Sequence, residues 1–235
     1  MKNTFKSFVV GPSNRIAYEA AKKVAQHPGK AFNPLHICGE TGLGATHLLR
    51  AISHAVIKRN PRAKVALITC EAFTTGYIDA LQRHRLAAFR KHYRGLDVLL
   101  LDDIQFLAGK EHTQAELIMI FKDLLEARTQ IVLTSVWNAG DIPQVNPRLI
   151  DLCYSGLVAT LRAPDYETRI AILRKKCMAL KVLVPDEVLE HIAGHTHTNI
   201  RCLEGALIRV CAYCSLTGRQ LTMANVDHIL LNNSL

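Results

Sequence analysis

A glycine-rich segment near the start of the chain has the spacing of a phosphate-binding loop. The residues Gly39-Glu40-Thr41-Gly42-Leu43-Gly44-Ala45-Thr46 match the pattern G-x-x-x-x-G-K-[ST] except at Ala45. Glycines let such a loop curl so that backbone N–H groups converge on phosphate oxygens, and the following helix adds its positive N-terminal end. The Thr46 hydroxyl can bind Mg²⁺, whereas Ala45 lacks the ammonium that contacts the β- and γ-phosphates. A simple strand-to-helix turn is the alternative, which three glycines and a threonine at this spacing disfavour.

Two carboxylates follow an apolar run farther along the chain. Leu99, Leu100 and Leu101 precede Asp102 and Asp103, as in a Walker B motif. Asp102 would hold a metal ion through water, and Asp103 would orient an attacking water. Acids that merely cap a strand end are the alternative. The glycine loop lies at the correct distance upstream for a Walker A and Walker B pair, which disfavours that alternative.

Apolar runs alternate with helical patterns over the first two thirds of the chain. Strands are predicted at 35–38, 64–69, 97–101, 130–134 and 157–161, and the third is nearly all apolar, as expected for a parallel strand covered on both faces. Helical spacing is present at 15–27 and 46–58. Strands separated by helices predict a three-layer α/β domain with a parallel five-stranded sheet over residues 1–163. Only helical patterns follow, at 166–180, 185–195, 200–216 and 223–231, which predicts a small all-α domain over 164–235.

The composition favours a folded protein with reduced cysteines and a polyanionic partner. Hydrophobic residues make up 49% of the 235 positions, and neither a signal peptide nor an apolar run of about 18 residues is present. The cytoplasm is therefore the expected location, without a membrane span. The seven cysteines are scattered, which fits free thiols better than disulfides. A net charge of +9 favours nucleic acid or an acidic protein face.

Positive charge is concentrated in residues 82–94. This segment contains no acid, and its five fixed cations are Arg83, Arg85, Arg90, Lys91 and Arg94. A solvated helix face and a DNA-binding surface are both consistent with this pattern.

Taken in order, these motifs resemble the AAA+ region of DnaA, the bacterial chromosomal replication initiator family. The likeness runs in register from about Phe8 to Thr222, and its strongest runs are FVVG at 8–11, NPL at 33–35, LDDIQFLAGKE at 101–111, QIVLTS at 130–135 and NIRCLEGAL at 199–207. The resemblance implies a P-loop AAA+ domain followed by a helical lid domain. It also implies binding of ATP or ADP with Mg²⁺, contact with single-stranded DNA and with DnaA-type replication proteins, and a weak homo-oligomer.

The resemblance assigns roles to individual positions. Arg201 matches the sensor 2 arginine of the lid, and Arg148 matches an inter-subunit arginine. Together with the loop motif it gives the nucleotide-binding residues Gly39, Gly42, Leu43, Gly44, Ala45, Thr46, His47 and Arg201, with Thr46 and Asp102 as metal ligands. The basic segment corresponds to a helical insertion after Phe73. Single-stranded DNA contacts are then implied for Ile78, Arg83, Arg85, Lys91, Arg94, Lys110 and His112.

Three departures from the family pattern affect the expected chemistry. The family has a lysine where Ala45 stands, the sensor 1 aspartate where Val136 stands and the arginine finger where Leu152 stands. An arginine finger alone is worth ~10³ to 10⁵ in rate in other NTPases. ATP hydrolysis is therefore expected to be absent or very slow, with Asp102 and Asp103 as the remaining catalytic candidates.

Several functions are open at this point. The favoured one is a DnaA-like ATP-binding protein acting in the initiation of chromosomal replication or its regulation, either as a fragment of an initiator or as a one-domain relative. A nucleotide-free AAA+-fold interaction module is the second. Another loader-type AAA+ ATPase is the third, which the LDDIQFLAGKE run argues against.

Overall fold

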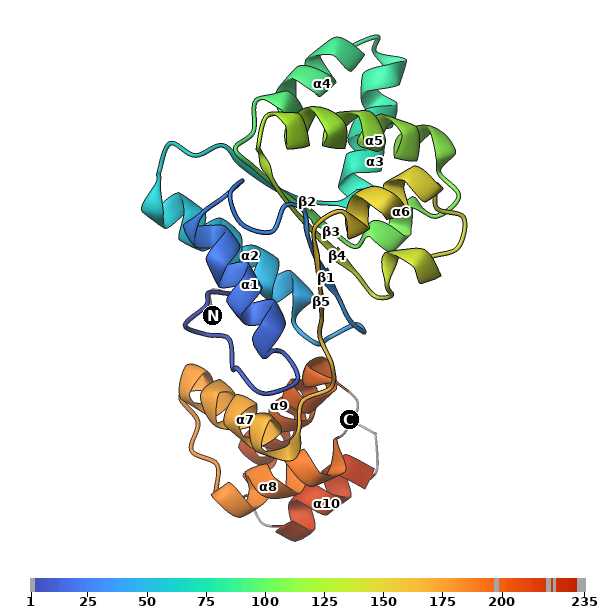
Figure 1. Cartoon of the computed structure of the whole chain (residues 1–235). Helices are drawn as coiled ribbons and strands as arrows, with labels where there is room; N and C mark the ends of the chain where they lie inside the picture. The colour runs from blue at the N-terminus through green and yellow to red at the C-terminus, as the bar shows by residue number, and fades with distance from the viewer. Residues whose placement is uncertain (1–2, 197–198, 219–220, 222, 232–235) are drawn as a thin grey trace.

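Five parallel strands form the central sheet of the chain, whose computed structural model describes residues 3–196, 199–218, 221 and 223–231 (Figure 1). Across the sheet the order is β2 (Val65–Thr69), β3 (Val98–Asp102), β4 (Gln130–Ser135), β1 (Leu35–Cys38) and β5 (Leu157–Thr160). Every neighbouring pair is parallel. The carboxyl ends of all strands therefore meet at one edge, where the loops that follow them can form a common site.

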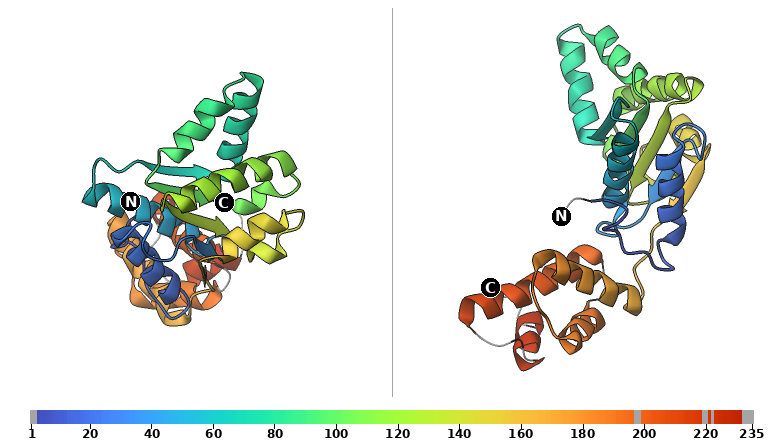
Figure 2. Two further views of the ribbon diagram at one scale, coloured as in Figure 1. Left: turned by 45° about the horizontal axis from the view of Figure 1, so that its top comes forward. Right: turned by 90° about the vertical axis from the view of Figure 1, so that its left-hand side faces the viewer.

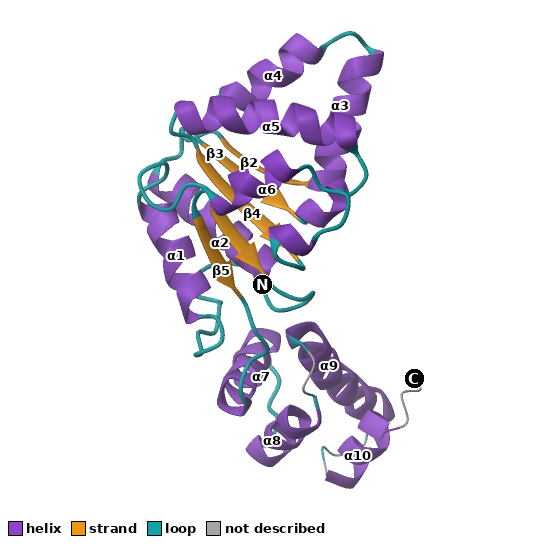
Figure 3. Cartoon of the chain, turned by 45° about the vertical axis from the view of Figure 1, so that its right-hand side comes forward, coloured by secondary structure: helices purple, strands orange, loops and turns teal. Residues whose placement is uncertain are grey.

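Helices cover both faces of this sheet, which explains why β3 is apolar at consecutive positions (Figure 3). Val98 and Leu100 pack in one core cluster with α1 (Arg15–Gln26) and α2 (Ala45–Arg59). Leu99 and Leu101 pack in a second core cluster, on the opposite face. That second cluster is closed by the helices α3 (Cys70–Gln82), α5 (Glu111–Glu126) and α6 (Pro147–Tyr154). The three-layer α/β architecture predicted from the strand pattern is confirmed.

Two of the helices in residues 70–154, α3 and α6, begin at side-chain caps. Thr69 Oγ1 accepts a hydrogen bond from the Ala72 N–H (3.1 Å) at the start of α3. Asn146 caps α6, and Pro147 occupies its first turn. Two short 3₁₀ helices, η1 (Ile104–Leu107) and η2 (Ala139–Asp141), lie after β3 and β4.

The helix α4 (Leu86–Arg94) completes a projecting pair with α3, in the region where the resemblance implied a helical insertion after Phe73. Figure 2 shows the pair at the end of the molecule that is farthest from the C-terminal helices. Phe89 and Tyr93 on α4 pack against the Phe73 ring, with ring centroids 5.4 and 5.3 Å from it. Aromatic contacts therefore hold α4 against α3.

The C-terminal helices form a separate all-α unit with its own apolar core, whose buried residues include Leu173, Ile192 and Leu207. Its members are α7 (Tyr166–Leu180), α8 (Asp186–His195), α9 (Ile200–Thr217) and α10 (Met223–Leu231). The small helical lid is thus confirmed as an element of the fold. The strand β5 ends at Thr160 before α7 begins, and a boundary between residues 163 and 164 remains our proposal.

No helix among the described residues is long and apolar enough to cross a membrane. Within the same residues no group of three or more histidine, cysteine and acidic side chains could hold a metal ion. All seven cysteines are free thiols.

Candidate nucleotide-binding site

The glycine loop joins the end of β1 to the start of α2 in left-handed backbone conformations. The φ angles are +87° at Gly42 and +106° at Gly44, a region that residues with a side chain rarely adopt. Gly44 is also the residue that precedes α2. The positive end of this helix and the loop N–H groups therefore face the same cavity, as an anion site requires.

A hydrogen-bonded cluster of Thr46, Asp102 and Thr134 lies beside this loop. The Thr134 hydroxyl donates to the Asp102 carboxylate and accepts a hydrogen bond from the Asp103 N–H (2.9 Å). Burial raises the pKa of Asp102, and hydrogen bonds from Thr134 and Thr46 counteract that rise. The two predicted metal ligands, Thr46 and Asp102, are thus already neighbours. Their hydroxyl and carboxylate oxygens fit the oxygen ligands that Mg²⁺ prefers.

Asp103 is held by both its backbone and its side chain. Its φ of 63° and ψ of 59° place it in the left-handed region, which aspartate tolerates better than most residues. The Gln105 side-chain amide donates to the Asp103 carboxylate (2.8 Å), and the same amide's oxygen accepts from the Val136 N–H (3.3 Å). Gln105 therefore links the Walker B acid to the position where the family has the sensor 1 aspartate.

The helical lid closes over the loop. The Ile200 N–H donates to the Gly42 carbonyl oxygen (3.2 Å). A Cβ at Gly42 would lie 3.0 Å from Asn199 Oδ1 and 3.2 Å from the Arg201 Cβ. A cavity of about 500 Å³ remains between loop and lid. Its lining includes Gly39, Gly42, Gly44, Ala45, Thr46, His47, Arg50, Asp102, Asp103, Thr134, Val136, Lys175, Lys176, Arg201 and Glu204.

Two of the cavity's four Arg and Lys side chains have polar partners in the described structure. Lys176 forms an ion pair with Glu204 (2.6 Å). The Lys175 ammonium donates to the carbonyl oxygens of Lys6 (2.6 Å) and Phe8 (3.3 Å). No hydrogen bond or ion pair engages the Arg50 or Arg201 side chain within the described residues.

The nucleotide residues predicted from the sequence come together with two qualifications. The Leu43 side chain is 4% exposed and packs in the core, and Leu43 is not among the residues that line the cavity. The His47 ring lines the cavity but contacts the Thr4 carbonyl oxygen (3.0 Å) and the Phe8 ring. Burial lowers the pKa of His47. His47 thus connects the loop helix to the N-terminal segment.

Sequence reasoning missed several residues at this site, namely Thr134, Gln105 and Arg50 and the lid side chains Lys175, Lys176 and Glu204. Thr134 and Gln105 gave no chemical signal of their own, because their roles depend on which carboxylate they face. Arg50 could have been found, since it follows Thr46 by four residues and therefore lies on the same face of α2.

The positions assigned to inter-subunit contact lie outside the cavity. Arg148 is exposed near the start of α6. Leu152, where the family has the arginine finger, is half-buried and packs against the core cluster that contains Leu149 and Cys153.

The structure corrects the expectation that the basic segment lacks compensating acids. Three of its five cations pair with acids from outside the segment: Arg83 with Asp79, Arg90 with Glu116 and Arg94 with Asp123, each at 2.7 Å. The last two acids come from α5, which is distant in sequence and adjacent in space.

Within the described residues, Arg85 and Lys91 are the two cations of the basic segment that form no ion pair, and both are exposed. Ile78, also exposed, lies on α3 in the same projecting pair, whereas Lys110 and His112 lie at the start of α5. The surface available to phosphates is therefore smaller than the sequence implied.

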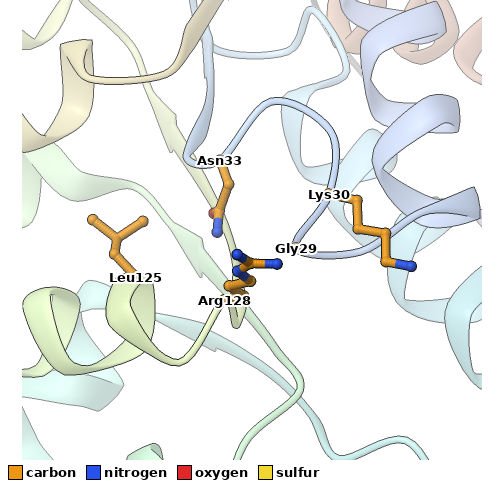
Figure 4. A pocket seen from close by; sticks show the side chains of 5 residues that line it. All are labelled: Gly29, Lys30, Asn33, Leu125 and Arg128. Atoms are coloured by element: carbon orange, nitrogen blue, oxygen red, sulfur yellow. The ribbon is translucent and has the colours of Figure 1, made fainter.

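A larger cavity, about 630 Å³, lies among Gly29, Lys30, Asn33, Leu125 and Arg128 (Figure 4). Asn33 precedes β1 and Arg128 precedes β4, so this cavity is at the opposite end of the strands. Two of its polar groups are already engaged. The Gly29 N–H donates to Gln130 Oε1 (2.9 Å), and the Asn33 amide donates to the Thr129 carbonyl oxygen (2.8 Å). We therefore place the candidate site at the glycine loop.

Comparison with known proteins agrees with this geometry. The model of the bacterial DnaA ATPase domain matches residues 1–160. The chromosomal replication initiator protein DnaA of Synechococcus sp. is 46% identical over 229 residues, which are 97% of this chain and 49% of that protein. The chain thus spans about half the length of the curated relatives it matches.

Solved structures show the same relationship. The crystal structure of domain III of Thermotoga maritima DnaA superposes with a TM-score of 0.93 at 39% identity, covering 99% of this chain and 96% of that one. A replication initiator DnaA bound to AMPPCP and single-stranded DNA superposes with a TM-score of 0.84 at 33% identity, covering 92% of this chain and 66% of that one. These matches show that the chain belongs to the bacterial DnaA ATPase domain family. It has the AAA+ fold, with a parallel five-stranded sheet and a helical lid.

Proposed function

We propose that this chain binds ATP or ADP with Mg²⁺ in the cavity between the glycine loop and the lid, and acts in the initiation of chromosomal replication or its regulation. The proposal rests mainly on the hydrogen bonds that the Thr46 and Thr134 side chains make to Asp102. These bonds connect the loop helix α2 to the Walker B strand β3. The relative bound to AMPPCP supports it.

Each group in the site has a chemical role under this proposal. The loop N–H groups between Gly39 and Thr46 would bind phosphate oxygens. Thr46 and Asp102 would hold Mg²⁺, which neutralises phosphate charge when bound. Arg201 would add a cation from the lid, and Asp103 would orient a water. This set suffices for binding, whereas Val136 and Leu152 leave hydrolysis absent or very slow.

Restoring the loop lysine tests the phosphate site directly. Ala45→Lys should tighten binding of a fluorescent ATP analogue by about 1 to 3 kcal/mol, the scale of a charge-assisted hydrogen bond. Titration in the presence and absence of Mg²⁺ measures the effect. Lys58→Ala changes charge elsewhere on α2 and should leave affinity unchanged. An Ala45→Lys protein with the affinity of the parent would show that the loop does not bind phosphate.

We propose single-stranded DNA as a partner, together with DnaA-type replication proteins and a weak homo-oligomer in which Arg148 contacts a neighbour. The relative bound to single-stranded DNA supports the DNA partner. On this chain the exposed side chains of Ile78, Arg85 and Lys91 lie on the projecting α3–α4 pair. Arg83 and Arg94 are also exposed, and their ion pairs at the surface leave them accessible to DNA phosphates. Lys110 and His112 extend the proposed contact to α5.

The DNA proposal predicts a change in salt dependence. Arg85→Ala/Lys91→Ala removes the two cations that have no ion pair, so it should weaken binding of a short oligonucleotide without base preference. The slope of log K against log salt should fall by roughly 1.4 for two lost contacts to a single strand. The control Lys58→Ala/Arg62→Ala removes one lysine and one arginine near the end of α2. Equal affinities and slopes for both double variants would rule out this DNA surface.

A further inference from the structure

The loop helix has another cation, one turn beyond the position of the missing lysine. Arg50 follows Thr46 by four residues in α2, so both side chains lie on one face of the helix about 5–6 Å apart at Cβ. Arg50 is exposed and lines the cavity beside Asp102.

Two features indicate that the Arg50 charge is directed at the site. It lines the cavity together with Gly44 at the start of α2 and with Asp102, and no hydrogen bond or ion pair engages its side chain within the described residues. The lid cations Lys175 and Lys176 are engaged by carbonyl oxygens and by Glu204. Within the described residues, Arg50 is thus the cation of the loop helix that lines the cavity, and it can turn to a ligand without breaking a hydrogen bond.

We propose that Arg50 binds the polyphosphate of the nucleotide in place of the lysine absent at position 45. A guanidinium presents paired N–H donors that fit two phosphate oxygens, and its charge does not depend on pH in the physiological range. Arg50 lies next to Thr46 and Asp102, the proposed Mg²⁺ ligands. It would therefore contact the phosphate groups nearest the metal ion. It therefore favours a nucleoside triphosphate over a diphosphate. This inference rests on the proposed nucleotide binding.

Substitution of Arg50 should produce a measurable loss of affinity. Arg50→Met keeps a long apolar stem, and it should weaken binding of a fluorescent ATP analogue with Mg²⁺ about 10-fold and of the ADP analogue less, the loss expected for one charged hydrogen-bonding group. Arg50→Lys should restore part of the loss, because the charge returns without the paired donors. The matched control is Arg62→Met, an exposed arginine outside the cavity. Thermal unfolding without nucleotide should be the same for all four proteins.

A double-mutant cycle separates a shared role from a merely additive one. If Arg50 replaces the lysine, Arg50→Met should cost clearly less in the Ala45→Lys background than in the parent, because two groups then serve the same phosphates. Additive effects, or an Arg50→Met protein that binds like Arg62→Met while the parent binds saturably, would overturn the inference and leave nucleotide binding intact. Absence of saturable binding in both the parent and Ala45→Lys would refute the proposed function, and this inference with it.

Discussion

ATP turnover by the parent chain should be close to background, and Ala45→Lys, Val136→Asp and Leu152→Arg together should raise it by about 10³-fold or more. The lysine, the sensor and the finger act on different parts of phosphoryl transfer, so their loss should slow hydrolysis at several steps. The arginine finger alone raises the hydrolysis rate ~10³- to 10⁵-fold in other NTPases. Residues that act as a unit are not additive. Each single restoration should therefore give far less than the triple.

The structure indicates how each restored group would be accommodated. Position 136 lines the cavity, and hydrogen bonds of the Gln105 side chain connect its backbone N–H to the Asp103 carboxylate. An aspartate at position 136 would therefore lie close to the Walker B acid. Position 152 is half-buried on α6, where an arginine can bury its stem and extend its charged end. A finger acts on a neighbouring subunit, so turnover should rise with protein concentration.

Phosphate release at several protein concentrations measures this effect. Adding Asp103→Asn to the triple variant should return turnover to background, which assigns the activity to this site. A parent turnover near roughly 1 per second, the low end of ordinary enzymes, would show that the catalytic parts are misplaced.

Lowering the pH from about 7 to about 4 should cost the native state about 3 kcal/mol through His36 alone. His36 is fully buried in β1 and its pKa is lowered from 6.5 to about 4 by burial. Its Nε2 pairs with Ser135 Oγ (2.7 Å), while its Nδ1 has no partner among the described residues. Between these two pKa values the unfolded chain binds a proton that the native state excludes. Stability is therefore lost as the pH falls through this window.

Urea unfolding at several pH values between about 4.5 and 7.5 tests the His36 prediction. His36→Gln removes the titrating group, so its free energy of unfolding should change less over this range than that of the parent. The matched control is His54→Gln, an exposed position on α2, which should retain the parent's pH dependence. The same pH dependence in all three proteins would contradict the assignment to His36.

Much of the fold and of the loop chemistry could be predicted from local sequence. The five strands and the helices α1, α2 and α7 to α10 lie within about two residues of their predicted bounds, because their apolar periodicity is strong. The glycine loop was recognisable since left-handed backbone at Gly42 and Gly44 demands glycine, whatever surrounds it.

The environment of the charged groups could not be predicted in this way. The segment from Arg83 to Arg94 has no acid of its own, yet α5 supplies Glu116 and Asp123 to it. The pairing depends on how α4 packs against α5. A charge count along the chain therefore overestimated the surface left for DNA.

The loop, the two Walker B carboxylates and the alternation of strands and helices can be recognised in the sequence, because each depends on local backbone preference and on burial of neighbouring side chains. The folded arrangement is needed to show which groups face Asp102 and Asp103, where Arg50 lies, and which arginines form ion pairs. Those outcomes depend on distances between residues far apart in the chain. Electrostatic and hydrogen-bond energies fall steeply with such distances, and a linear pattern does not contain them.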